Sequence, residues 1–139
     1  MTRITPIGCG LFLTLLAGSV CAADLQVEVR GVRNAQGKIM IGLFDSAADF
    51  PTKMVQGLAL DAAAPGVTGM FTGLPNGDFA VAVYQDENGN GKLDKNLVGV
   101  PTEPYGFSRD AMGRMGPPRF ADAKLKVDGT SQTIVIHLR

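Results

Sequence analysis

Cysteine is missing from most of this 139-residue chain. Its two cysteines, Cys9 and Cys21, both lie near the N-terminus. The remainder can therefore form no disulfide and no cysteine-ligated metal centre. Histidine is almost absent as well. His137 alternates with apolar residues near the C-terminus, a pattern that favours an outward-facing strand residue over a base or a metal ligand.

Sequence signatures of the common catalytic sites are missing too. Ser46, Ser108 and Ser131 lack the flanking glycines of a nucleophile elbow. The chain has no phosphate-binding loop and no dinucleotide fingerprint. Carboxylates are present, but nothing in the sequence places two of them across a cleft. We therefore predict a protein that is not an enzyme, unless Glu103, Arg109 and Asp110 cluster in a cleft.

The chain has no excess of charge of either sign. It contains 13 basic and 13 acidic residues, and loss of the N-terminal segment with Arg3 would leave 12 against 13, a formal charge of −1. A near-neutral balance argues against nucleic acid and against an anionic membrane surface as partners.

The N-terminus has the layout of a secretory signal peptide. Arg3 supplies the basic start, residues 7–17 are apolar, and small residues precede a predicted cleavage site after Ala23. The apolar run falls short of the roughly 20 residues of a spanning helix, which disfavours a retained anchor. Lipidation of Cys21 is the minor alternative. We expect export to the periplasm or the extracellular space, with no membrane span in the mature chain.

The mature chain, residues 24–139, is long enough for one domain with a hydrophobic core. Short apolar or alternating segments, separated by turn signals, predict about seven strands of an all-β antiparallel sandwich. The first two segments, 25–32 and 38–44, are expected to pair as a hairpin. The segment 79–84 is apolar on both faces and should be a central strand. The other candidate strands are 55–60, 67–71, 97–100, 124–127 and 133–138.

A polar loop follows the predicted central strand and has the spacing of a calcium loop. Oxygen-bearing residues stand at template positions 1, 3, 5, 7 (through the backbone carbonyl) and 9, with glycine at position 6: Asp86, Asn88, Asn90, Lys92, Asp94 and Gly91. Alternating oxygens of this kind can converge on one hard cation.

Two features separate this loop from an EF-hand. Leu97 stands at position 12, where a bidentate glutamate is expected, and the flanking segments are not helical in pattern. A missing ligand would have to come from Glu87, Glu103 or Asp45. Binding should be weak, with Kd roughly 10⁻⁴ to 10⁻³ M. The alternative is a metal-free loop, because Asn-Gly pairs form tight turns without help.

The segment 101–120 is rich in proline and glycine and is expected to be one long irregular loop. It could bind an anionic or carbohydrate ligand through aromatic and charged residues: Glu103, Tyr105, Phe107, Arg109, Arg114 and Arg119. The alternative is structural, with Tyr105, Phe107 and Phe120 covering the outer apolar face of the central strand.

Long motifs of the chain resemble a known family. The runs 73–94, 99–108 and 116–120, with the opening runs 25–34 and 37–45, are similar to the exported bacterial proteins labelled domain of unknown function 2141. The resemblance covers essentially the whole mature chain and implies neither an activity nor catalytic residues. The turn at 73–79 also resembles that of prealbumin-like sandwich modules, which supports the fold.

These observations predict an exported, non-enzymatic binding or structural module, with Ca²⁺ as the one cofactor hypothesis. The alternative is a small-ligand carrier or cell-envelope accessory protein that uses the segment 101–120.

Overall fold

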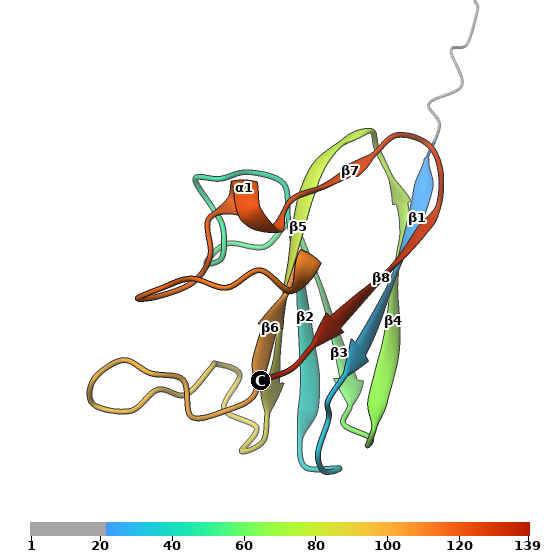
Figure 1. Cartoon of the computed structure of the whole chain (residues 1–139). Helices are drawn as coiled ribbons and strands as arrows, with labels where there is room; N and C mark the ends of the chain where they lie inside the picture. The colour runs from blue at the N-terminus through green and yellow to red at the C-terminus, as the bar shows by residue number, and fades with distance from the viewer. Residues whose placement is uncertain (1–21) are drawn as a thin grey trace, which may run out of the picture.

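The structure is a computed structural model that describes residues 22–139. Most of the predicted signal segment, with Cys9 and Cys21, lies outside the described residues, so export and cleavage stay predictions. Within these residues the chain forms eight strands, one 3₁₀ turn (η1) and one short helix (Figure 1). Their bounds are β1 Ala23–Arg30, β2 Lys38–Phe44, β3 Gln56–Asp61, β4 Gly66–Leu74, β5 Gly77–Asp86, β6 Tyr105–Phe107, η1 Ser108–Asp110, α1 Phe120–Ala123, β7 Leu125–Val127 and β8 Gln132–His137.

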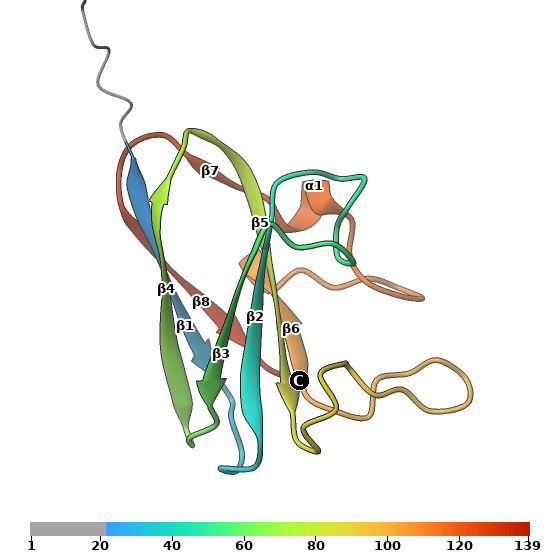
Figure 2. The same cartoon turned by 180° about the vertical axis from the view of Figure 1, so that it is seen from behind.

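The strands form two sheets that face each other (Figures 1 and 2). One sheet has the order β4-β1-β8 and the other β3-β2-β5-β6, with β7 pairing the start of β5. The predicted all-β sandwich is confirmed. Among the described strands one pair, β1 with β8, is parallel, whereas the sequence predicted antiparallel pairing throughout.

The predicted hairpin of the first two strands is wrong, because β1 and β2 belong to different sheets. The chain leaves β1 at Gly31, whose φ of +80° suits glycine, and Val32 then turns inward and donates its N–H to Pro65 O. The crossing segment is fixed from the second sheet. Gln85 Nε2 donates to Asn34 Oδ1 at 2.8 Å and to Gln36 O at 2.9 Å. The connection therefore closes one end of the sandwich.

β5 is the central strand, as predicted. It pairs with β2, β6 and β7. Its inner face, with Phe79, Val81 and Val83, joins the core between the sheets. On its outer face the buried Ala80 lies opposite Phe44, the first of four aromatic rings whose neighbouring centroids are 5.3–6.0 Å apart: Phe44, Phe50, Phe107 and Phe120.

Part of the segment 101–120 extends the sheet. Phe107 pairs with Ala82 and Tyr105 with Tyr84, so the segment supplies the edge strand β6 where a wholly irregular loop was expected. The expected strand at 97–100 does not form. The residues on either side of it, Lys95 and Pro101, form an isolated bridge.

Backbone hydrogen bonds join the two sheets along the β6 and β8 edges. Tyr105 N donates to Arg139 O at 3.2 Å, and Arg139 N donates to Tyr105 O at 2.9 Å. We call this junction between the two sheets the seam. Gly106 permits this close approach, because a Cβ atom there would lie 2.8 Å from His137 O. The described residues contain no helix long and apolar enough to cross a membrane.

We predict that Gly106→Ala lowers the free energy of unfolding by about 1–3 kcal/mol, since the added methyl group meets backbone that cannot move without opening the seam. Gly57→Ala is the matched control, because its Cβ would meet the flexible, exposed tip of Met54, and it should change stability by less than about 0.5 kcal/mol. Urea unfolding measures both. Equal losses in the two variants would contradict a specific role for the seam.

Candidate functional site

The polar loop begins at the end of the central strand. Asp86 is the last residue of β5 and is 4% exposed. Its carboxylate accepts hydrogen bonds from two backbone groups of the loop, Asn90 N at 3.2 Å and Gly91 N at 2.8 Å. The turn requires the left-handed backbone of Gly89 and Gly91, with φ of +73° and +76°. A buried carboxylate satisfied in this way folds the loop back over the end of the strand.

The remaining side chains predicted as ligands lie together within the loop. Asn88 Nδ2 and Asn90 Nδ2 donate to the two oxygens of Asp94, at 2.5 and 2.7 Å. Asn90 Oδ1 accepts the N–H of Lys92 at 3.1 Å. The structure thus brings together the side chains at template positions 3, 5 and 9, beside a position-1 carboxylate that organises the backbone.

Of the two candidate ligands from outside the loop, Glu103 and Asp45, Glu103 lies at the loop, where it contacts the third candidate, Glu87. The residue is 7% exposed, and its carboxylate accepts two backbone hydrogen bonds, Oε1 from Glu87 N and Oε2 from Asp94 N, each at 3.0 Å. It ties the start of the loop to its end. Asp45 was a wrong candidate. It follows the last residue of β2, whereas Asp86 pairs with Lys38 at the first residue of that strand.

Three carboxylates of this site affect the pKa of one neighbouring side chain, Tyr84. Burial raises the pKa of the Tyr84 phenol, and the negative charges of Asp86, Glu103 and Asp94 raise it further. Within residues 22–139, however, no three His, Cys, Asp or Glu side chains are grouped closely enough to hold a metal ion by themselves. Cation binding here would depend on the asparagine and backbone oxygens as well.

The residues predicted as a ligand loop do not form one site. Tyr105 and Phe107 lie in β6 with ring centroids 6.0 Å apart, and Phe107 packs against Phe50. The three arginines are exposed, and Arg119 forms an ion pair with Asp122 at 2.9 Å. Glu103, Arg109 and Asp110 do not share either of the two cavities described below.

A cavity of about 390 Å³ lies beside the polar loop. Its lining combines two guanidinium groups with carboxylates and prolines: Arg33, Asn34, Glu87, Pro101, Thr102, Glu103, Pro104 and Arg139. Of the predicted ligand-loop residues, Glu103 alone belongs to it. No sequence pattern pointed to Arg33 and Arg139, because the crossing segment and the end of β8 meet only in the folded chain.

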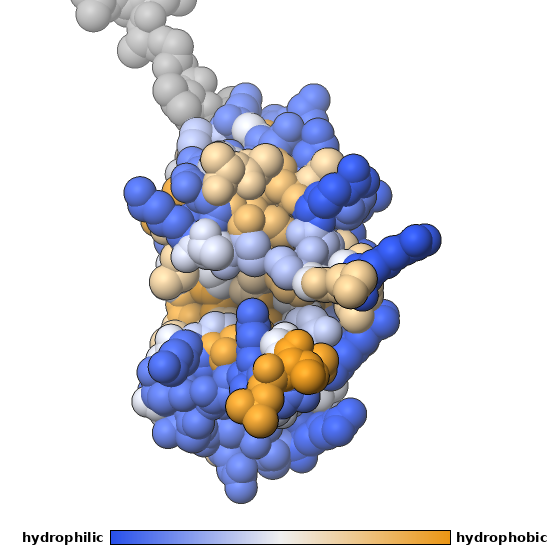
Figure 3. Space-filling model, turned by 90° about the vertical axis from the view of Figure 1, so that its left-hand side faces the viewer, coloured by the Kyte–Doolittle hydropathy of each residue, from blue (hydrophilic) through white to orange (hydrophobic). Residues whose placement is uncertain are grey.

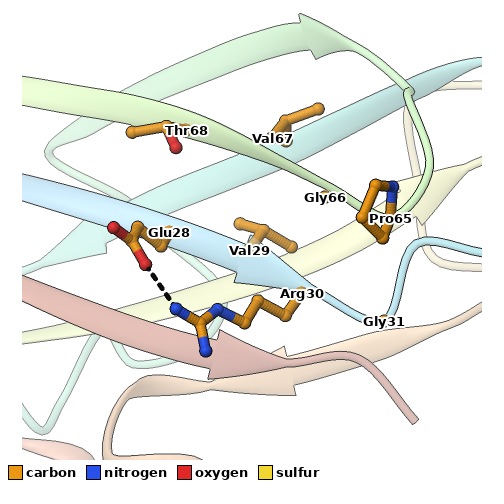
Figure 4. A pocket seen from close by; sticks show the side chains of 8 residues that line it. All are labelled: Glu28, Val29, Arg30, Gly31, Pro65, Gly66, Val67 and Thr68. Atoms are coloured by element: carbon orange, nitrogen blue, oxygen red, sulfur yellow. Dashed lines mark hydrogen bonds and ion pairs between the residues drawn. The ribbon is translucent and has the colours of Figure 1, made fainter.

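A second cavity, of about 300 Å³, is lined by the end of β1, the start of β4 and the residues next to them, Gly31 and Pro65 (Figure 4). Its charged groups neutralise each other, since Arg30 donates to Glu28 at 3.0 Å. Gly66 forms part of the wall. The position requires glycine, because a Cβ atom there would lie 2.2 Å from Val29 O. This cavity therefore presents mainly strand backbone and small apolar groups.

An acid and a histidine pair at the edge of β8. Asp110 accepts the backbone N–H of His137 at 2.9 Å, and the ring Nδ1 of His137 lies 2.8 Å from its other oxygen. His137 is exposed, as predicted, but the sequence did not reveal its partner. The nearby Ser108 hydroxyl is buried and bonded to backbone, accepting from Val81 N and donating to Ala123 O.

The Asp110–His137 pair holds a strained turn. Arg109 and Asp110 are consecutive non-glycine residues in the left-handed region, with φ of +60° and +49°, a conformation that costs about 1–2 kcal/mol per residue. Burial alone would raise the pKa of Asp110. The hydrogen bonds from His137 and the charges of His137 and Arg139 outweigh it and lower that pKa below its ordinary 3.8.

We predict that this pair makes stability depend on pH in the acid range. Because the folded pKa of Asp110 is lowered, its contribution is present above about 3.8 and is lost as the pH falls through the lower folded value. The melting temperature of Asp110→Asn should therefore fall less than that of the wild type between pH 5 and pH 3. Asp128→Asn, at an exposed turn, serves as the control. Parallel melting curves for wild type and Asp110→Asn would contradict the assignment.

Comparison with known proteins gives one match. The model of a family described as "Uncharacterized protein conserved in bacteria (DUF2141)" matches residues 27–135, which include all eight strands in whole or in part. No curated protein and no solved structure matches the chain.

Proposed function

Because the chain belongs to the DUF2141 family of bacterial proteins, whose description names no activity, we propose a function from the geometry of its own residues. We propose that it is an exported, non-enzymatic binding module whose loop 86–94 binds Ca²⁺ weakly. The observation that carries the proposal is the convergence of the side chains of Asn88, Asn90 and Asp94 beside the buried carboxylate of Asp86.

The loop geometry suits a hard cation. The backbone is already folded by Asp86 and Glu103, so binding would not have to order it. The two asparagine amides that now donate to Asp94 can turn over and present oxygen at the same positions, since both ends of the amide occupy nearly the same space. The carboxylate of Asp94 would then share a cation with two amide oxygens.

The affinity should be low. Of the two carboxylates at template positions, Asp86 and Asp94, Asp94 is the one that accepts no backbone N–H. Leu97, at the place of the bidentate acid, points into solvent with 107% exposure. Few charged ligands and an open loop correspond to a Kd of roughly 10⁻⁴ to 10⁻³ M. This range is that of extracellular calcium-binding modules, which agrees with an exported protein.

We predict that 10 mM Ca²⁺ raises the free energy of unfolding by about 1–3 kcal/mol, the amount that mass action gives for this Kd range. Asp94→Asn should lose most of this gain, because it removes the ligand charge and keeps the shape of the side chain. Asp128→Asn is the matched acid control. Thermal melts and calorimetric titration measure the effect. An absence of heat and of stabilisation, or an equal gain in wild type and Asp94→Asn, would rule the site out.

A second candidate is a small-ligand carrier, and the 390 Å³ cavity favours it. Arg33 and Arg139 present guanidinium groups, which suit a carboxylate. Gln85, which hydrogen-bonds the cavity-lining Asn34, carries a buried Oε1 with no partner among the described residues. A small ligand with a carboxylate would match the two guanidinium groups of this lining. The ligand-binding part of the segment 101–120 would then be residues 101–104.

We predict that a member of a panel of amino acids and short dicarboxylates, each at 10 mM, raises the melting temperature of the wild type and not of Arg33→Ala. Arg114→Ala is the control, because Arg114 is exposed and lies outside the cavity. The carrier function is excluded if no compound shifts the wild type, or if Arg33→Ala responds equally.

A further inference from the structure

Large exposed apolar side chains gather on one side of the molecule. Of the eight among the described residues, seven lie outside the strands, in three separate segments, and the eighth, Met70, lies in β4. We name these segments the three apolar tips and define them as residues 52–55, 95–100 and 112–115. Their exposed apolar members are Met54, Val55, Leu97, Val98, Val100, Met112 and Met115.

The chain segments that carry the tips project from the same side of the sandwich, left in Figure 1 and right in Figure 2. Aromatic contacts support this placement for two of them. The ring centroid of Phe50, just before the first tip, lies 5.9 Å from that of Phe107 and 6.0 Å from that of Phe120. These two residues flank the third tip in the sequence. Figure 3 looks onto this side and shows apolar surface interleaved with hydrophilic protrusions.

The middle tip is built to hold its apolar residues outward. Asn96 Oδ1 accepts the N–H groups of Val98 and Val100, both at 3.0 Å, and Asn96 N donates to Val100 O at 2.9 Å. The turn is therefore closed on itself. Leu97 and Val98 remain 107% and 83% exposed, instead of folding back onto the sheet.

Each tip carries one cation and no acid. Lys53 stands beside Met54, Lys95 two residues before Leu97, and Arg114 beside Met115. All three cations are exposed. The acids nearest in sequence hydrogen-bond other partners: Asp49 accepts from Ser46, Asp94 from the Asn88 and Asn90 amides, and Asp110 contacts His137.

We propose that this side of the sandwich docks on a membrane surface that contains anionic lipid. Apolar side chains that enter the headgroup boundary, accompanied by cations that meet lipid phosphates, are the chemistry of interfacial binding. The tips are separate protrusions, which a soft lipid surface accommodates more readily than a rigid protein surface does. Met54, Met112 and Met115 add flexible, adaptable contacts. The near-neutral total charge does not oppose this, since the local charge of the tips is positive.

Three tips reaching one surface would reinforce one another, because the first contact raises the effective concentration of the others. The proposal does not rest on calcium binding or on the cavity, since none of the three tips lies within the loop 86–94 and none lines the cavity.

The test is flotation of the exported chain with vesicles of phosphatidylcholine alone and with one quarter phosphatidylglycerol. We expect binding to the anionic vesicles, reduced about tenfold by Leu97→Ser/Val98→Ser because two apolar anchors are lost. Replacing Lys95 and Arg114 by Gln should weaken binding to anionic vesicles, and 0.5 M NaCl should have the same effect by screening.

The matched control is Met70→Ser, which removes an exposed apolar side chain from β4. It should bind like the wild type, and melting temperatures should show that all variants are folded. The proposal is overturned if anionic vesicles do not float the wild type. Equal binding by Leu97→Ser/Val98→Ser and the wild type overturns it as well, because any contribution of the common N-terminal segment would be the same in both.

Discussion

The burial of β5 on both faces is the constraint on which the rest of the molecule depends. Its inner face forms the core with the opposite sheet, and its outer face needs the aromatic cluster contributed by the segments after β2 and around β6. A strand in this position must end in groups that satisfy buried polar atoms. Gln85 and Asp86 do so, one holding the crossing segment and the other folding the polar loop.

Local pattern was sufficient to predict the central strand, the sandwich and the position of the polar loop. Phe79–Tyr84 is apolar in both alternating sets, and the spacing from Asp86 to Asp94 is a property of one short segment. Pairing was harder to predict. The apolar residues of β1 and β2 would face the core whether the two strands paired with each other or lay in different sheets, so the apolar pattern cannot distinguish the two arrangements. The apolar run 97–100 was wrongly predicted to be a strand, because its apolar side chains suggested burial, whereas they are exposed in a turn.

The features that sequence reasoning missed join residues far apart in the chain. Glu103 was one of three possible partners of the polar loop, and its double acceptance from Glu87 N and Asp94 N is visible only after folding. The same holds for the Asp110–His137 pair and for the cavity between Arg33 and Arg139. Glu103 also lines that cavity, so the polar loop and the cavity share one carboxylate, and a change at either would alter the surroundings of that group.

The seam between Tyr105 and Arg139 has a consequence for self-association. An uncovered strand edge exposes unpaired N–H and C=O groups that can recruit a strand from another molecule. Along this edge, Tyr105 and Arg139 exchange two backbone hydrogen bonds, and the Asp110 carboxylate takes the N–H of His137. The folded chain therefore presents no free strand edge here on which a second molecule could extend the sheet. This protects the domain against aggregation, although its described residues contain no cysteine and hence no disulfide to hold the fold.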